Sequence, residues 1–290
     1  MRWPEDAACG VVVTIDLDGD LPFLAASPEN HLRVKSRSVG HYGIDAGSAR
    51  LLRVLREASI LATWFVPGEI ARRHPGLVRE IDAQGHLIGV HGDLHLDFDE
   101  LDLLGQLREM TRGRAALAEV LGEAPLGFRT TAGEWALDFP REAASAGFTW
   151  SSSLPSDDVP FRVAPGLMEV PFRYETEDYQ YLAYNLDPPF PPGQSRITPI
   201  EVVEENWWQE YLGAARWGTL FVLRLNAELM GTPGRARMLR RFLGRIHADG
   251  RGIMLTCADA ARLAEVEPAS RHEHPYQRFE RLFVEGDERA

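Results

Sequence analysis

Short apolar segments typical of strands alternate with amphipathic segments along nearly all of the 290 residues, and this alternation constrains the fold most strongly. The first strand candidates are residues 11–15, 61–66 and 86–91, and Asp45 is the expected N-cap of a helix over residues 46–58. The remaining strand candidates are residues 126–129, 147–152, 167–170, 219–225 and 252–256, and the remaining helix candidates are residues 77–83, 99–121 and 233–248. Strands that alternate with helices from end to end predict an α/β protein with a parallel sheet or barrel.

Two stretches break this alternation. Residues 19–43 are irregular, and residues 172–200 carry four tyrosines followed by a cluster of prolines. Long irregular segments inside a compact domain are usually functional loops or lids. The tyrosine-rich segment could pack against the barrel rim or form a lid over a compact substrate. We interpret residues 1–290 as one domain with loop elaborations at about 19–43 and 172–200.

The charge balance and the cysteines exclude several functions. Asp and Glu number 43 against 31 Lys and Arg, a formal charge of −12, so neither nucleic acid nor an anionic membrane surface is an expected partner. No run approaches the roughly 18 apolar residues that span a bilayer. Residues 1–10 lack the basic and apolar parts of a secretion signal. Cys9 and Cys257 lie in apolar runs typical of core positions. These features predict a cytoplasmic protein, and they leave a small or neutral substrate possible.

Two aspartates stand at the end of the first predicted strand. Asp16 and Asp18 share one side of an extended chain, because strand side chains alternate with a period of two. A charge at the end of a buried strand is disfavoured unless it is paired or bound to a metal. One aspartate could therefore bind a cation while the other acts as a base. The alternative is an exposed acidic turn.

Two histidines follow the third predicted strand. His91 and His95 are four residues apart, so they would share a face if a helical turn began there, and both could then bind one ion. Alone, this spacing is also found in surface or capping histidines. Together with an aspartate at another strand end, it predicts a catalytic metal site with open positions for water and substrate.

An arginine, Arg129, ends the strand candidate at residues 126–129. It could form a surface salt bridge. It could instead pair with a catalytic carboxylate and keep that carboxylate ionised.

A series of motifs along the chain resembles the polysaccharide deacetylase family, also called the NodB-homology domain. The motifs are TIDLDGD (14–20), SVGHYG (38–43), ATWFVPG (62–68), GHLIGVHGDLH (85–95), GFRT (127–130), SSSLPSDD (151–158) and GTPGR (231–235). The resemblance runs from about residue 12 to 264. It is strongest to the intracellular branch that includes peptidoglycan-deacetylase-like proteins, allantoinase-like proteins and cyclic imide hydrolases.

The resemblance implies a distorted (β/α) barrel with its active site at the carboxyl ends of the strands. It implies that Asp18, His91 and His95 hold one divalent metal ion, for which zinc is expected. It further implies that Asp16 is the general base and that Arg129 orients it. Related proteins suggest a homo-oligomer, either a dimer or a tetramer.

Two positions depart from the family pattern. A histidine that protonates the leaving amine usually follows the strand at residues 219–225, but here Asn226 stands there, which can donate a hydrogen bond but cannot deliver a proton. Leu96 stands where a glutamate commonly follows the second metal histidine. Glu134 is a conceivable substitute acid, although a solvated loop glutamate would also fit. An imide or activated amide would need less help from an acid, because its leaving nitrogen is less basic.

Three functions therefore compete. The first is a metal-dependent hydrolase that acts on carbon–nitrogen amide bonds other than peptide bonds, in a small substrate such as a cyclic imide. The second is an N-deacetylase of an amino sugar or polysaccharide, as the family name suggests. The third is a metal-binding protein that has lost catalysis, because Asn226 replaces the usual acid.

Overall fold

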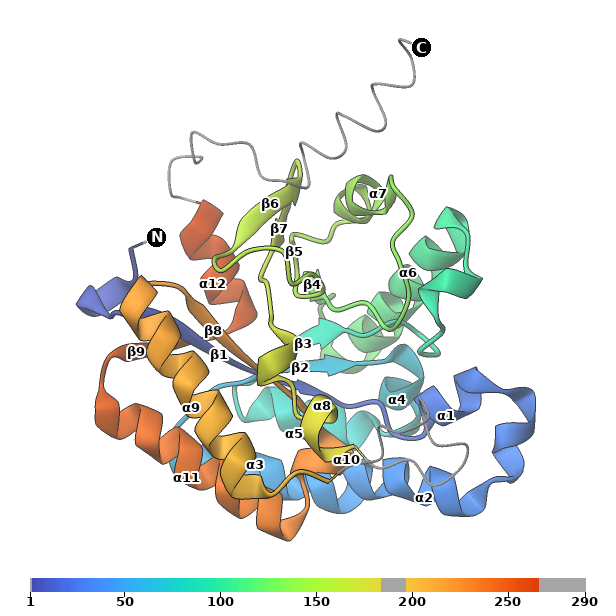
Figure 1. The fold of residues 1–290 in the computed structure, drawn as a ribbon. Helices are drawn as coiled ribbons and strands as arrows, with labels where there is room; N and C mark the ends of the chain where they lie inside the picture. Colours follow the sequence, from blue (N-terminus) through green and yellow to red (C-terminus); the bar gives the residue numbers. More distant parts are fainter. Residues whose placement is uncertain (1, 184–196, 266–290) are drawn as a thin grey trace.

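The computed structural model describes residues 2–183 and 197–265, which form a nine-stranded sheet with helices packed around it (Figure 1). The strands are β1 (Cys9–Asp16), β2 (Thr63–Val66), β3 (Leu87–Val90), β4 (Gly127–Phe128), β5 (Trp150–Ser151), β6 (Phe161–Ala164), β7 (Leu167–Glu169), β8 (Leu220–Asn226) and β9 (Gly252–Leu255). The α-helices are α1 (Leu21–Ala26), α2 (Val34–Tyr42), α3 (Ser48–Ala58), α4 (Gly68–Arg73), α5 (Pro75–Ala83), α6 (Leu103–Leu121), α7 (Phe139–Ser145), α8 (Tyr179–Leu182), α9 (Ile200–Trp217), α10 (Ala227–Met230), α11 (Pro233–Asp249) and α12 (Cys257–Glu265).

The sheet follows the order β6-β7-β5-β4-β3-β2-β1-β8, and β9 also pairs with β1. All of these pairings are parallel except that of β6 with β7. The sheet curls into a half-barrel (Figure 1), which confirms the predicted distorted (β/α) barrel. Because the strands are parallel, the carboxyl ends of β1, β3, β4 and β8 meet at one edge, where barrel enzymes place their active sites.

The central strand β1 is buried along its full length. Val11, Val13 and Ile15 pack into the larger hydrophobic core, whereas Val12 packs into a second cluster with Phe65. Both faces of the strand are therefore covered. This explains why its sequence is a continuous apolar run and does not alternate.

Helices cover the sheet from several sides. α3, α9 and α11 lie together at one side of the sheet, whereas α6 packs against α4 and α5 (Figure 1). α12 contacts the β5, β6 and β7 strands. Among the described helices, none combines the length and the apolar character that a transmembrane helix requires.

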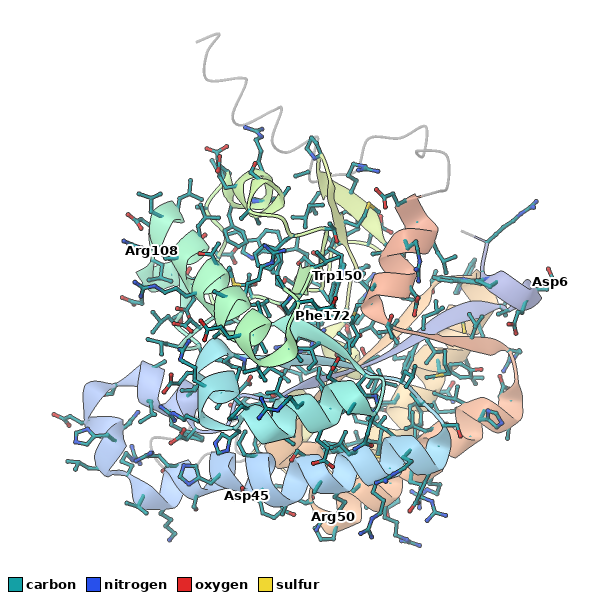
Figure 2. The ribbon with its side chains drawn as sticks, turned by 180° about the vertical axis from the view of Figure 1, so that it is seen from behind. Asp6, Asp45, Arg50, Arg108, Trp150 and Phe172 are labelled. Atoms are coloured by element: carbon teal, nitrogen blue, oxygen red, sulfur yellow. The ribbon has the colours of Figure 1, made fainter. Side chains whose placement is uncertain are left out.

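The prediction of an irregular loop at residues 19–43 is wrong for most of that stretch. α1, a 3-10 helix (Pro28–Leu32) and α2 follow one another there, and a π-helical turn (Gly43–Gly47) joins α2 to α3. Asp45 is exposed within this turn (Figure 2), so it is not the N-cap of α3.

Tertiary contacts explain why the sequence of this segment does not look helical. The buried residue of α2 is Gly40, so the helix has no apolar stripe. A Cβ at Gly40 would lie 2.0 Å from the carbonyl oxygen of Gly19, which shows how closely the two segments approach. The buried carboxylate of Asp20 pairs with Arg37 Nε at 2.7 Å and with Arg73 Nη1 of α4 at 3.1 Å. These ion pairs, rather than an apolar face, fix α2 against the barrel.

The second predicted loop, residues 172–200, is only partly described. It contains a 3-10 helix (Tyr174–Thr176), α8 and the first residue of α9, whereas residues 184–196, with the proline cluster, lie outside the described residues. Tyr181 packs against the core, and Tyr174 is 53% exposed. That residues 1–290 form one domain stays a prediction.

Candidate metal centre and active site

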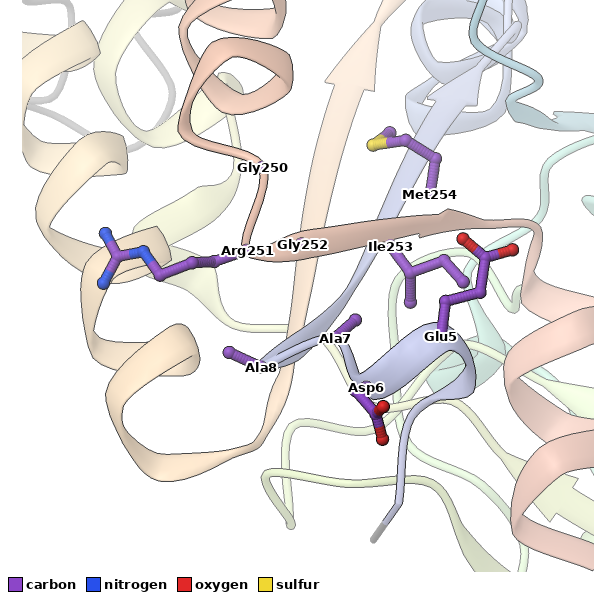
Figure 3. A pocket seen from close by; sticks show the side chains of 9 residues that line it. All are labelled: Glu5, Asp6, Ala7, Ala8, Gly250, Arg251, Gly252, Ile253 and Met254. Atoms are coloured by element: carbon purple, nitrogen blue, oxygen red, sulfur yellow. The ribbon is translucent and has the colours of Figure 1, made fainter.

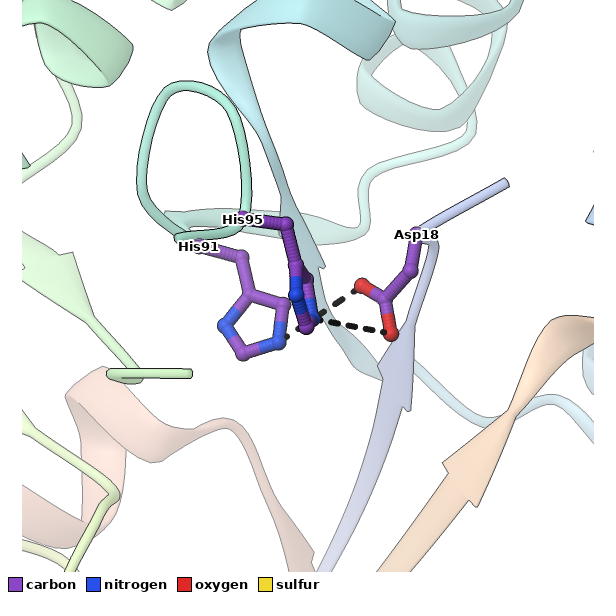
Figure 4. Close-up of side chains that lie close together, drawn as sticks. All are labelled: Asp18, His91 and His95. Carbon is purple, nitrogen blue, oxygen red and sulfur yellow. Dashed lines mark ion pairs between the residues drawn. The ribbon is translucent and has the colours of Figure 1, made fainter. Parts of the chain in front are cut away.

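The structure brings Asp18, His91 and His95 together (Figure 4). Asp18 follows β1, and the two histidines belong to the loop after β3. One possible ligand atom from each residue lies within 4.8 Å of those of the others. His91 Nε2 is 3.5 Å from Asp18 Oδ1, and His95 Nε2 is 3.6 Å from Asp18 Oδ2.

The chemistry of these three side chains fits a metal ion. Asp18 Oδ1 is buried and has no hydrogen-bond partner within the described part of the chain. His91 Nδ1 lies 2.8 Å from the carbonyl oxygen of Arg129. A carbonyl only accepts, so Nδ1 carries the hydrogen and Nε2 presents its lone pair toward Asp18. Burial lowers the pKa of His91, which favours the neutral imidazole that a metal requires.

The predicted helical turn between the two histidines is not present. Gly92 and His95 both adopt left-handed backbone angles, with φ of 74° and 60°. The loop is held instead by Glu109 of α6, whose Oε1 accepts from the backbone N–H groups of Asp93 at 2.9 Å and Leu94 at 2.7 Å. It also accepts from the N–H of Leu96 at 3.2 Å. The two imidazoles therefore meet, with ring centroids 5.1 Å apart, because a helix of the outer layer clamps the loop.

Asp16 is fully buried and is gripped by two arginines. Arg129 Nη1 donates to its Oδ1 at 2.7 Å, and Arg224 Nε donates to its Oδ2 at 2.9 Å. Burial alone would raise the pKa of Asp16, but the two guanidinium groups outweigh it and hold that pKa well below its ordinary value. The alternative of an exposed acidic turn is wrong, because Asp16 and Asp18 are 0% and 5% exposed.

Arg129 is not a surface residue, since it is 1% exposed. Besides Asp16, its guanidinium donates to the carbonyl oxygen of Ser152 at 2.7 Å and to Thr14 Oγ1 at 3.0 Å. It also lies over the ring of Phe65, 4.2 Å from the centroid. The structure thus excludes a surface salt bridge. It agrees with the other alternative, in which Arg129 pairs with a buried carboxylate, here that of Asp16.

Arg224 is a site residue that the sequence analysis missed. It lies on β8 opposite Thr14 of β1 and also pairs with Glu177, with Nη1 3.2 Å from Oε1. The signal was available, because Arg224 is the one charged residue in the otherwise apolar strand candidate at residues 219–225.

Asn226 lies beside Asp16 in the β1–β8 register, but its side chain already has a partner. Its Nδ2 donates to Asp178 Oδ1 at 2.7 Å, and its backbone N–H donates to Asp178 Oδ2 at 2.9 Å. Burial raises the pKa of Asp178 to about 8, although the hydrogen bonds from Asn226 oppose this shift. A catalytic role for Asn226 stays a prediction.

Glu228, in α10, is half-buried and contributes a further carboxyl group. Its Oε2 atom has no hydrogen-bond partner among the described residues. Burial raises the pKa of Glu228 well above its ordinary value, and the charges of Asp18, Asp178 and Asp16 raise it further. Glu134, the substitute acid considered from the sequence, is an exposed residue.

A cavity of about 380 Å³ lies elsewhere (Figure 3). It is lined by residues 5–8, which precede β1, and by residues 250–254, which begin before β9. This is the amino end of the strands, opposite the end where Asp16 and Asp18 lie. The cavity is therefore not part of the candidate site.

Comparisons with known proteins give a consistent result. The family model described as polysaccharide deacetylase matches residues 41–151, a segment that contains His91, His95 and Arg129. A peptidoglycan-N-acetylglucosamine deacetylase of Bacillus cereus is 31% identical over 96 residues, which is 31% of this chain and 35% of that protein. A chitooligosaccharide deacetylase of Rhizobium leguminosarum bv. trifolii is 30% identical over 100 residues, which is 34% and 46% of the two chains. The matches thus span about a third to a half of these relatives.

Solved structures match over more of the chain. A Mycobacterium smegmatis structure classed as a polysaccharide deacetylase is 31% identical, covers 94% of this chain and 96% of that one, and has a TM-score of 0.85. Puue allantoinase is 20% identical over 93% and 94% of the two chains, with a TM-score of 0.79. At that identity, the likeness to the allantoinase concerns the fold alone.

Proposed function

The chain belongs to the polysaccharide deacetylase family, and on that premise we propose that it is a metal-dependent hydrolase of an amide bond in a small substrate. Deacetylases such as those it resembles hydrolyse carbon–nitrogen bonds other than peptide bonds, which supports the predicted class of enzyme. The observation that carries the proposal is the meeting of Asp18, His91 and His95 around a buried, unpartnered carboxylate oxygen, beside Asp16.

Asp18, His91 and His95 would hold one divalent ion. We expect zinc, because two imidazoles and one carboxylate are a donor set found in catalytic zinc sites. When bound, the ion would polarise the carbonyl group of the substrate and lower the pKa of the attacking water. The carbonyl oxygen of Arg129 would keep the His91 ring in the orientation that this binding needs.

Asp16 would accept the proton of the attacking water. Its two oxygens each accept one hydrogen bond from a guanidinium group, so each retains a lone pair. Arg129 and Arg224 keep Asp16 ionised at every physiological pH and fix the orientation of its carboxylate. Because they lower its pKa, they also make Asp16 a weaker base. We propose Arg129 as the main positioning residue, because it is the more deeply buried of the two.

For the substrate, we propose a small amide, with cyclic imides included. Asn226 cannot deliver a proton, which favours leaving nitrogens of low basicity. The second candidate is N-deacetylation of an amino sugar or polysaccharide, which the names of the Bacillus and Rhizobium relatives favour. The third is metal binding without turnover, which the replacement of the family histidine by Asn226 favours. The cytoplasmic location and the dimer or tetramer stay predictions.

A metal analysis and a hydrolysis screen would test the proposal together. Purified wild-type protein, loaded with zinc, would be offered imides, hydantoins, formamides and N-acetylglucosamine oligomers. We expect about one ion per chain and the highest kcat/KM on an imide or activated amide. A clear preference for the acetamido sugars would establish the second candidate. Bound metal without turnover of any amide would establish the third.

A further inference from the structure

Glu169 is a buried carboxyl group at the carboxyl end of β7 that the proposed reaction does not yet use. It is 0% exposed, so a bound substrate would not touch it, and it lies beside Ser151 in the β5–β7 register. In the sequence it is the one charged residue of the apolar strand candidate at residues 167–170. A charged residue at the end of a buried strand is disfavoured unless it is paired, so its partners indicate its role.

The partners of Glu169 are backbone N–H groups that follow β5. Its Oε1 accepts from the N–H of Ser153 at 2.5 Å and from that of Leu154 at 2.7 Å. The N–H of Ser152, just before them, donates to the carbonyl oxygen of Phe128 at 2.9 Å and so ties the chain to β4. Glu169 therefore fixes the chain just beyond the end of β5. A carboxyl oxygen can accept these bonds whether the group is ionised or protonated, because a proton occupies only one of the two oxygens.

The segment that Glu169 fixes, residues 152–154, is called the β5 loop, and it holds the guanidinium group of Arg129. The Nε of Arg129 donates to the carbonyl oxygen of Ser152 at 2.7 Å, and its Nη2 donates to Ser152 Oγ at 3.0 Å. The remaining nitrogen, Nη1, donates to Asp16 Oδ1 at 2.7 Å. The position of the β5 loop therefore sets the direction from which Arg129 reaches the proposed base.

The backbone beside Arg129 is bound to the same loop. The N–H of Thr130, the next residue, donates to Ser153 Oγ at 3.0 Å. Ser153 is one of the two residues whose N–H groups Glu169 binds. Both the side chain of Arg129 and the adjoining backbone are thus attached to the segment that Glu169 holds in place.

We infer that Glu169 is a positioning residue for the proposed base, acting through the β5 loop and Arg129 on Asp16. This inference rests on the proposed amide hydrolysis. Without the carboxyl group, two N–H groups of the β5 loop lose their acceptor, and the loop is expected to shift. The guanidinium group then no longer holds Asp16 in line with the attacking water, which slows the reaction without weakening substrate binding. Glu169 exchanges no proton in this role.

Two matched substitutions test this role. Glu169→Met keeps the approximate size of the side chain and removes both oxygens, whereas Glu169→Gln keeps an oxygen that can accept from both N–H groups. On the best amide of the screen, we expect Glu169→Met to lower kcat by roughly 10- to 100-fold, as small misplacements do, with KM within about 2-fold of the wild type. Glu169→Gln should keep kcat within about 3-fold of the wild type.

A double-mutant cycle shows whether the effect passes through Arg129. In the Arg129→Ala background the guanidinium group is already absent, so the addition of Glu169→Met should lower kcat by less than about 2-fold further. Glu204, a buried glutamate of α9 that pairs with Arg241, provides the control. Glu204→Met makes the same chemical change away from the site and should match the wild type in kcat.

Two further measurements accompany the kinetics. Thermal unfolding shows whether Glu169→Met is folded. If it is not, Glu169→Asp, which draws the oxygens back by one carbon, takes its place in both backgrounds with the same expected direction. Elemental analysis should find as much metal in Glu169→Met as in the wild type.

The outcomes separate this inference from the proposed function. An unchanged kcat in Glu169→Met, an equal loss in Glu169→Gln, losses that multiply in the Arg129→Ala background, or loss of the metal would overturn the positioning role alone. A wild-type protein that cleaves no amide of the screen would overturn the proposed function and the inference with it.

Discussion

Asp16 and Asp18 lie two residues apart at the carboxyl end of β1, yet their carboxylates have opposite surroundings. Both oxygens of Asp16 accept from arginines, which come from the strand ends of β4 and β8. Asp18 faces two imidazoles from the loop after β3, and its Oδ1 has no hydrogen-bond partner among the described residues. Neighbouring strands, rather than the aspartates themselves, therefore decide which carboxylate is neutralised within the protein and which one needs a cation from outside.

The largest effect is expected on the Asp18 side of this comparison. Asp18→Ala, and the double variant His91→Ala/His95→Ala, should lose the metal completely, because each removes part of the donor set. Elemental analysis of the purified proteins measures this. Asp16→Asn is the matched control and should keep about one ion per chain. One metal ion per chain in the double variant would contradict the assignment of His91 and His95 as metal ligands.

The next effect concerns the Asp16 side. Asp16→Asn should lower kcat by roughly two to four orders of magnitude on the best amide of the screen, because an amide cannot accept the proton of the attacking water. Steady-state kinetics on metal-loaded protein measure the loss, and thermal unfolding shows whether the variant is folded. An Asp16→Asn enzyme with full activity would contradict the proposed base.

Glu169 offers a second carboxyl group to set beside Asp18. Like Asp18 Oδ1, its Oε2 atom is buried and has no hydrogen-bond partner among the described residues. Its Oε1 accepts from the N–H of Leu154 at 2.7 Å, and burial raises its pKa from 4.5 to about 7. Since its folded-state pKa is the higher one, the folded state binds more protons between those values, and stability falls as pH rises through them.

In wild type, the free energy of unfolding should therefore decrease by up to about 3 kcal/mol from pH 4.5 to 7, relative to Glu169→Gln. Urea denaturation of both proteins across this window measures the difference. Parallel pH profiles for the two proteins would show that Glu169 is not protonated in the folded state.

The smallest effect concerns the two arginines. Arg129→Ala and Arg224→Ala should each raise the pKa of Asp16, because each removes one cation, and the acidic limb of the pH–rate profile should move upward. The shift should be about one pH unit and larger for Arg129, whose charge acts more strongly on Asp16. Profiles of kcat/KM in the two variants measure this. A downward shift in either variant would mean that the acidic limb of the profile reports the pKa of a group other than Asp16.

The meeting of Asp18, His91 and His95 could be predicted because the chain shows parallel strands, and the carboxyl ends of parallel strands share an edge. The local path of the chain could not be predicted equally well. His95 reaches His91 through a left-handed loop that depends on Glu109, a residue of α6 whose role has no local sequence signal.

The irregular appearance of residues 19–43 has a similar cause. α2 lacks an apolar stripe, and the ion pair of Asp20 with Arg73 joins residues 53 positions apart. Periodicity detects helices that bury an apolar face, so it misses one held by charges. Arg224 carried a sequence signal, as the one charged residue of its strand candidate, but its partner Asp16 becomes visible only once β8 lies beside β1.

The clamp formed by Glu109 has a consequence for sequence divergence. It binds the loop through the backbone N–H groups of Asp93, Leu94 and Leu96, and every amino acid except proline supplies such a group. The side chains at positions 94 and 96 can therefore change without moving the two imidazoles. Position 96 can therefore carry leucine, where the resemblance led us to expect a glutamate, while the geometry beside it is kept. The loop can thus acquire new substrate contacts by mutation, whereas Glu109 itself has little freedom to vary.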